Sequence, residues 1–250
     1  MSVSFTARAL YKSTTLKPIL RPSTFAFSTS VPSHSYSSSQ KRLSSNMAAP
    51  APQRGFEKFR NAIYEFDKVV STTSKLLSFA HTLSIPIYIT TQTRSKLGPT
   101  VSELQPLLLS PDGVSPHPLV KADLDKTLFG MYTPALAALF AQNPEQVPSH
   151  IALVGIESHI CVTQTCLALR KRHPGMKIYV IADGVSSCNK EEIPIALARL
   201  RQEGVTVTSS EGWMYECMGD AGIKEFREVV KIVKETGEGT KAALRALAKI

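Results

Sequence analysis

Apolar and polar positions alternate along this chain in two periods. Between residues 67 and 235, short apolar runs of strand length are separated by longer stretches with one apolar face at helical spacing. Such alternation is typical of βαβ units, so we predict an α/β fold, a three-layer αβα sandwich with a parallel sheet. The predicted strands are residues 85–90, 150–157, 176–183 and 205–209, and the predicted helices are 67–84, 133–141, 161–173, 191–203 and 223–235. Residues 91–120 are predicted to be mostly irregular.

The segment 150–162 is the most informative for chemistry. An apolar run stops at Gly155, and Cys161 follows six residues later at the start of a stretch of helical character. The unpaired N–H groups and the dipole of a helix N-terminus favour a thiolate, and parallel sheets bind ligands beyond the carboxyl ends of their strands. Cys161 is therefore a candidate nucleophile. The alternative is a buried structural cysteine, because free Cys is among the most buried residue types.

Charge divides the chain into unequal parts. Residues 1–56 contain no Asp or Glu and carry seven of the nine net positive charges, and residues 1–46 are rich in Ser. We predict a mitochondrial transit peptide at 1–46, with a matrix location, a linker at 47–56, one domain at 57–236 and a basic tail at 237–250. An ordinary disordered basic leader is the alternative. A start at Met47 would give a cytoplasmic form.

Other classes of site are disfavoured. The basic charge sits in the leader, so it does not indicate a nucleic-acid partner, and no apolar run is long enough for a transmembrane helix. The four cysteines form no CxxC pair, which leaves a thiol redox protein as a weaker alternative. Between Thr91 and Lys126 the only histidine is His117, so no metal is predicted, and no cofactor is expected.

Several segments together resemble a known family. In chain order they are residues 57–63, 90–92, 97–104, 125–131, 155–162 and 182–187. With these segments the chain resembles the isochorismatase-like cysteine hydrolase family and, within it, the isochorismatase domain-containing proteins. The resemblance covers residues 57–235 and implies a parallel sheet between helical layers.

The resemblance also implies a catalytic set of an Asp, a Lys and a Cys. The Cys attacks a carbonyl or related carbon, the Asp moves the proton, and the Lys holds both by its charge. Cys161 and Lys126 match the Cys and the Lys. The backbone N–H groups of Glu157 and Cys161 are expected to face the developing oxyanion. His159 and Gln92 are candidate substrate-pocket residues.

The family's Asp has no counterpart in this chain. It ends the first strand in the pattern apolar-apolar-x-Asp-x-Gln-x-x-Phe, and aligning Phe59 puts Arg54 at its position. Two prolines in residues 48–53 argue against a central strand there, so we expect the first central strand to be missing, or its gap to be filled by another segment. Arginine stays charged and cannot accept a proton. A lost exon, a splice form or an inactive family member would each explain the departure, and Glu57 lies three residues too far along to replace the acid.

The sequence therefore predicts a cysteine hydrolase for a small amide or acyl substrate, impaired because its Asp is absent. Family members that hydrolyse isochorismate lack the cysteine, which favours acyl chemistry here. The alternative is a catalytically inactive interaction protein with the same fold. The expected partners are a small-molecule substrate and further copies of the chain in a homo-oligomer, with no nucleic acid and no membrane.

Overall fold

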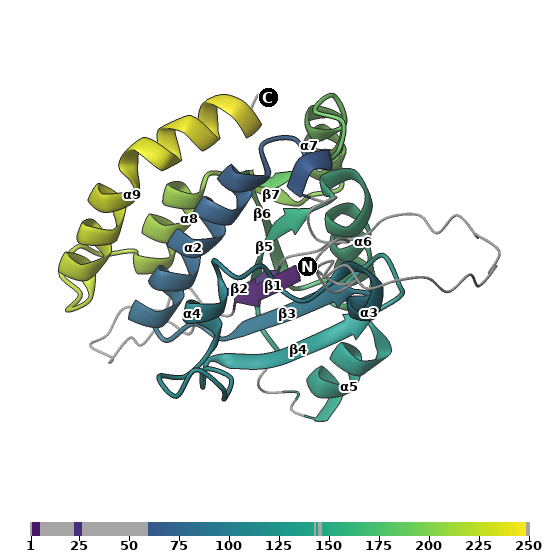
Figure 1. The fold of residues 1–250 in the computed structure, drawn as a ribbon, viewed down its shortest axis with the longest axis horizontal. Coiled ribbons are helices and arrows are strands. Elements are labelled where there is room, and N and C mark those ends of the chain that lie inside the picture. The colour runs from purple at the N-terminus through teal and green to yellow at the C-terminus, as the bar shows by residue number, and fades with distance from the viewer. Residues whose placement is uncertain (1, 6–22, 27–59, 143, 145–146, 249–250) are drawn as a thin grey trace, which may run out of the picture.

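The protein is a three-layer αβα sandwich (Figure 1), as predicted. A computed structural model describes residues 2–5, 23–26, 60–142, 144 and 147–248. One face of the sheet is covered by α2 (Phe66–Thr82), α8 (Ser210–Met218) and α9 (Phe226–Leu247). On the other face lie α5 (Pro134–Gln142), α6 (Thr163–Arg172) and α7 (Glu192–Gln202).

The sheet contains the four predicted strands, with somewhat different bounds. They are β3 (Ile87–Gln92), β5 (His150–Ile156), β6 (Lys177–Ser186) and β7 (Thr206–Thr208), and β5, β6 and β7 pair in parallel. The residues of β3 are all buried, as are all but the first residues of β5 and β6. Their nearly continuous apolar runs are expected because helices cover both faces of a parallel sheet.

The gap expected in the middle of the sheet is filled by the chain's own N-terminal segments. β1 (Ser2–Phe5) and β2 (Ser23–Ala26) both lie between β3 and β5 (Figure 1). β1 is antiparallel to both neighbours and β2 is parallel to both. Two parts of the predicted leader therefore belong to the sheet. The predicted linker at 47–56, with Arg54, lies outside the described residues.

Three elements differ from the predictions. β4 (Val120–Lys126) pairs in parallel with β3 and was missed. Exposed charged residues alternate with apolar ones along this edge strand, so it has no continuous apolar run. Helix α8 was also missed. The helix predicted at 223–235 is longer, because α9 continues to Leu247 through most of the segment predicted as a basic tail and buries Ala243 and Leu247. Residues 91–120 are mostly irregular, with single turns at α3 (Arg94–Leu97) and α4 (Gln105–Leu108).

A buried polar network joins α2, β6, α8 and α9. The Lys75 ammonium, with 2% of the residue exposed, donates to Ser210 Oγ and Thr240 Oγ1, each at 2.6 Å. Asp183 accepts the backbone N–H of Ser210 at 2.7 Å and the Ser210 hydroxyl. Burial lowers the pKa of Lys75, and the charge of Asp183 opposes that effect. The network ties the helical layer to the sheet through one hydroxyl held between opposite charges.

Candidate active site

Two neighbouring strand ends hold the candidate lysine. Gln92 ends β3 and Lys126 ends β4, and the two residues are paired in register. Lys126 Nζ donates to Gln92 Oε1 at 2.6 Å and to the backbone oxygens of Leu128 and Phe129, each at 2.9 Å. Gln92 Nε2 in turn donates to the Thr127 carbonyl at 2.8 Å. The amide of Gln92 thus positions the ammonium, and its predicted contact with substrate stays a prediction.

Lys126 is buried and lies in the field of Cys161. The residue is 5% exposed, although lysine is almost never buried unless it is paired. Burial lowers the pKa of Lys126, while the neighbouring side chains of Cys161 and Asp125 oppose that effect. Both sequence-predicted catalytic residues lie at the carboxyl edge of the sheet, Lys126 at the end of β4 and Cys161 in the turn after β5. An ammonium held by three neutral acceptors is available to stabilise a nearby anion.

Cys161 lies in a π-helical turn. This turn, η2 (Ser158–Val162), directly precedes α6, so the expectation that the thiol sits in the first turn of the α-helix is corrected by one turn. Such π segments are rare and occur often at functional sites. The Thr165 hydroxyl donates to the Cys161 carbonyl at 2.5 Å and accepts the Met131 N–H at 2.9 Å. Cys161 itself has 0% exposure, so a substrate reaches it only when the structure opens.

Glu157 and His159 precede Cys161 in the chain. The buried Glu157 carboxylate accepts the Cys188 backbone N–H at 3.0 Å and lies 3.8 Å from His159 Nδ1. His159 Nδ1 is also 2.9 Å from Ser187 Oγ, at the end of β6. Together with burial, Glu157 raises the pKa of Cys188 to about 11. The His159 side chain is partly exposed. The roles of His159 in the pocket and of the Glu157 and Cys161 N–H groups at an oxyanion stay predictions.

The acids closest to this framework already have partners. Asp125 accepts the Arg94 N–H at 2.8 Å and the Thr91 hydroxyl at 3.2 Å. The N-terminal strands that fill the gap supply no carboxylate, since residues 1–56 contain neither Asp nor Glu. The strands that lie in the gap therefore bring no acidic side chain to it, and the expected loss of the Asp stays a prediction.

Sequence reasoning missed some residues that support the site and the core. Thr165 links the Cys161 turn to Met131, and Lys75 anchors the buried network. A signal for Lys75 was present, because it lies on the same helical face as the buried Thr72 and Phe79. No comparable signal marked Thr165.

The described residues contain neither a cluster of metal ligands nor a membrane-spanning helix. No three His, Cys, Asp or Glu side chains come together there as a possible metal site. His117 does have a histidine neighbour, His81, but their rings stack face to face with centroids 4.1 Å apart. None of the described helices is both long and apolar enough to span a bilayer.

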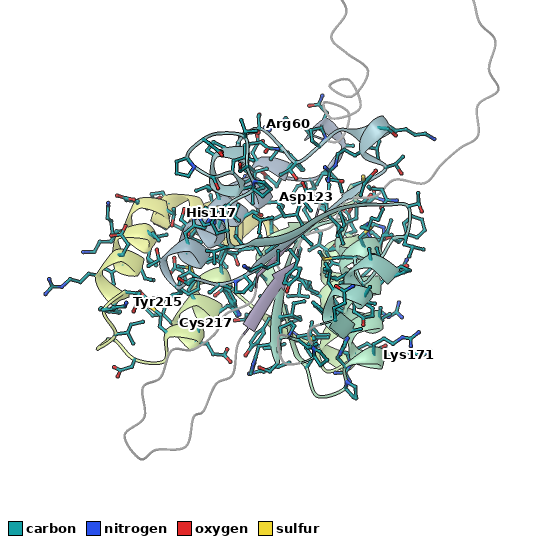
Figure 2. The ribbon with its side chains drawn as sticks, turned by 90° about the horizontal axis from the view of Figure 1, so that it is seen from below. Arg60, His117, Asp123, Lys171, Tyr215 and Cys217 are labelled. Atoms are coloured by element: carbon teal, nitrogen blue, oxygen red, sulfur yellow. The ribbon has the colours of Figure 1, made fainter. Side chains whose placement is uncertain are left out.

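A surface groove adjoins the loop that holds Lys126. It has a volume of about 550 Å³ and is lined by Leu128, Tyr132, Lys171 and Arg172, among others. Lys171 marks its position on the flank of the molecule opposite Tyr215 and Cys217 (Figure 2). The groove thus lies on the outer side of the loop whose carbonyls bind the Lys126 ammonium.

Comparisons with known proteins agree with this framework. Residues 52–212 match the isochorismatase domain family, so β1 and β2 lie outside the match. The secreted isochorismatase effector Isc1 of Phytophthora sojae is 37% identical over 179 residues, which cover 72% of this chain and 80% of that protein. Human isochorismatase domain-containing protein 2 is 36% identical over 179 residues, covering 72% and 79%.

A solved structure with the same fold is that of MAR1 ribonuclease from Caenorhabditis elegans. It is 30% identical, with a TM-score of 0.60, and the alignment covers 71% of this chain and 84% of that one. The match to the family domain spans more than half of the chain, and the similarity to curated relatives covers most of the described domain. The chain therefore belongs to the isochorismatase family.

Proposed function

We propose that this chain carries the framework of a cysteine hydrolase for small amide or acyl substrates, with Cys161 as the nucleophile. The observation that carries the proposal is the buried Lys126 ammonium, held by Gln92 and two carbonyls in the field of Cys161. The Cys161 thiolate would attack the carbonyl carbon and the leaving group would depart with a proton. Water would then hydrolyse the thioester.

In this proposal Lys126 acts by its charge. A nearby opposite charge favours the ionised form of a group, so the ammonium would favour the thiolate as the attacking species. The backbone N–H groups of Glu157 and Cys161 would stabilise the oxyanion, at a few kcal/mol for each donor. Neither contribution provides a base to take the thiol's proton.

The missing Asp limits the reaction. General acid–base catalysis contributes roughly 10²–10⁴-fold, so the chain as it stands should be slower than an intact relative by about that factor. Buried Cys161 reduces the rate further, because substrate access requires opening. We therefore propose an impaired hydrolase.

The nucleophile is tested by thiol alkylation with iodoacetamide, followed by mass spectrometry of the four cysteine peptides. Lys126→Met should slow alkylation of Cys161 at pH 7 by about tenfold or more, because each tenfold corresponds to about 1.4 kcal/mol of thiolate stabilisation. Cys217 serves as the internal reference and Lys190→Met, which removes an exposed lysine, as the matched control. Equal alkylation of Cys161 in the wild type and Lys126→Met would overturn the proposal.

The missing acid is tested by repair. Residues 48–56 are replaced with a strand that follows the family pattern and ends in Asp, and an otherwise identical strand ending in Asn is the control. Both proteins and the original chain are assayed against small amides and esters, and against RNA because a structural relative is described as a ribonuclease. Hydrolysis of an amide or ester by the Asp protein alone supports the proposal. No hydrolysis, or equal hydrolysis by the Asn protein, contradicts it.

A second candidate is an interaction protein without catalysis. The full burial of Cys161 and the absence of any acid from residues 1–56 favour it. It predicts that Cys161→Ala leaves folding and every binding activity unchanged, whereas a hydrolase would lose its residual turnover. Size measurement by light scattering tests the accompanying proposal of a homo-oligomer.

We also propose that residues 1–46 direct the protein to the mitochondrial matrix. The composition supports this, with basic residues, many serines and no acid. A fluorescent protein fused behind residues 1–46 should enter mitochondria, and a fusion that starts at Met47 should remain in the cytoplasm. Identical distribution of the two fusions would contradict the proposal.

A further inference from the structure

The slot between β3 and β5 is bounded by two strand edges of one sheet. The other edge of β3 pairs with β4, and the other edge of β5 pairs with β6, so the edges that face the slot are the ones taken by β1 and β2. Both bounding strands are buried almost throughout. Their slot-facing N–H and C=O groups therefore need a partner backbone, because water does not satisfy them there.

Two different segments use this slot, and they use it in opposite directions. β1 pairs with Ala152–Gly155 of β5 in antiparallel register, whereas β2 pairs with His150–Leu153 in parallel. The two registers overlap at Ala152 and Leu153. One strand edge can form a full ladder with only one partner, so the two segments compete at these positions.

The ladders favour β1 as the main occupant. Each of its four residues has a partner on both walls of the slot, from Ser2 opposite Thr90 and Gly155 to Phe5 opposite Ile87 and Ala152. β2 has four partners on β5 but only one on β3, where Phe25 is opposite Ile87. A strand held on both sides satisfies more backbone groups than one held mainly on a single side.

We propose that the slot is a strand-binding site for an extended peptide, which this chain fills in cis with Ser2–Phe5. Recognition is by main-chain hydrogen bonds to β3 and β5, so the ligand class is an extended apolar segment without proline. The proposal is independent of any hydrolase activity.

The slot has a consequence for the leader. A peptidase that removed residues 1–46 after folding would separate β1 and β2 from the chain but would break none of their hydrogen bonds. The leader is then held only as a bound peptide. Its place becomes open to exchange with a second extended segment supplied in trans.

Register is tested first, in the full chain, by disulfide trapping. Val3 is opposite Val154, so Val3→Cys with Val154→Cys should form a disulfide under mild oxidation, mapped by mass spectrometry. Val3→Cys with Leu153→Cys is the matched control, because adjacent strand residues point to opposite faces. Bridging in the first variant alone supports the proposal. A third variant, Thr24→Cys with Ile151→Cys, tests the register of β2. Equal bridging in the first two variants, or bridging in the third alone, overturns the assignment of Ser2–Phe5.

Exchange is tested on the full chain with a protease site inserted within residues 47–56 and cut after folding. The leader fragment should remain with the domain on gel filtration. A tenfold excess of a fluorescent peptide of residues 1–10 should displace it and become bound. The same peptide with Val3→Pro should bind at least tenfold more weakly, because proline breaks a strand ladder. Immediate loss of the leader fragment with no peptide binding, or equal binding of the proline peptide, would overturn the proposal.

Discussion

Asp183→Ala should reduce the free energy of unfolding by about 3–5 kcal/mol, because it leaves a buried charge without its partner. The variant removes the acceptor of two hydrogen bonds from Ser210, whose residue exposure is 0%, as is that of Asp183. Hydrogen bonds to a charged group contribute roughly 1.5–3 kcal/mol each, so losing two of them gives about 3–6 kcal/mol, which overlaps that range. The Lys75 ammonium would keep its two hydroxyl acceptors but lose the carboxylate that opposes its burial.

Urea unfolding followed by far-UV circular dichroism measures this loss as a lower midpoint at constant slope. Glu235→Gln, which changes an exposed acid on α9, is the control and should stay within about 0.5 kcal/mol of the wild type. Adding Lys75→Met to Asp183→Ala should destabilise by less than the sum of the two single variants, since it removes the uncompensated charge. A loss below about 1 kcal/mol for Asp183→Ala, or strict additivity in the double variant, would refute the reasoning.

Three other predictions concern stability. Burial and His117 lower the pKa of His81 to about 4, below its usual 6.5. The stability that neutral His81 contributes to the folded state is therefore complete above pH 6.5 and is lost as the pH falls toward 4. For this partly exposed ring the loss is about 1–2 kcal/mol after screening, and His81→Phe should flatten the acid limb of a stability–pH profile. Leu247→Ala should cost about 2–3 kcal/mol in urea unfolding because Leu247 is 1% exposed, and no loss would mean that the end of α9 does not pack. Gly184→Ala should cost about 1–3 kcal/mol, since its Cβ would come within 2.6 Å of Val154 Cγ1, and an unchanged melting temperature would contradict that clash.

The sequence predicted those parts of the fold whose burial leaves a regular pattern. β5 was recognisable because the nearly continuous apolar run from Ile151 to Ile156 is typical of a strand covered on both faces. β4 was not recognisable, because Lys121, Asp123, Asp125 and Lys126 interrupt it and an edge strand tolerates such charges. The predicted helix at 223–235 stopped short of Gly237 and Gly239, but α9 continues past both, because burial of Leu247 on the domain outweighs their low helix propensity.

The candidate site was predictable in its residues but not in its geometry. Cys161 and Lys126 stood in segments that resemble the family, and the structure places both at the carboxyl edge of the sheet. The π turn that carries Cys161 has no sequence signal, because it depends on how the end of β5 meets α6. The carbonyls that bind Lys126 also have no signal, since every residue offers a carbonyl and only the backbone path selects those of Leu128 and Phe129.

The loop after β4 connects the interior of the protein with its outer surface. Leu128 and Phe129 present their side chains to solvent, 53% and 40% exposed, while their carbonyls turn inward to Lys126. A molecule that binds those two side chains and rotates their peptide planes would break two of the three hydrogen bonds of the Lys126 ammonium. Binding at the outer surface of this loop would then move the Lys126 ammonium and change the electrostatic potential at the sulfur of Cys161.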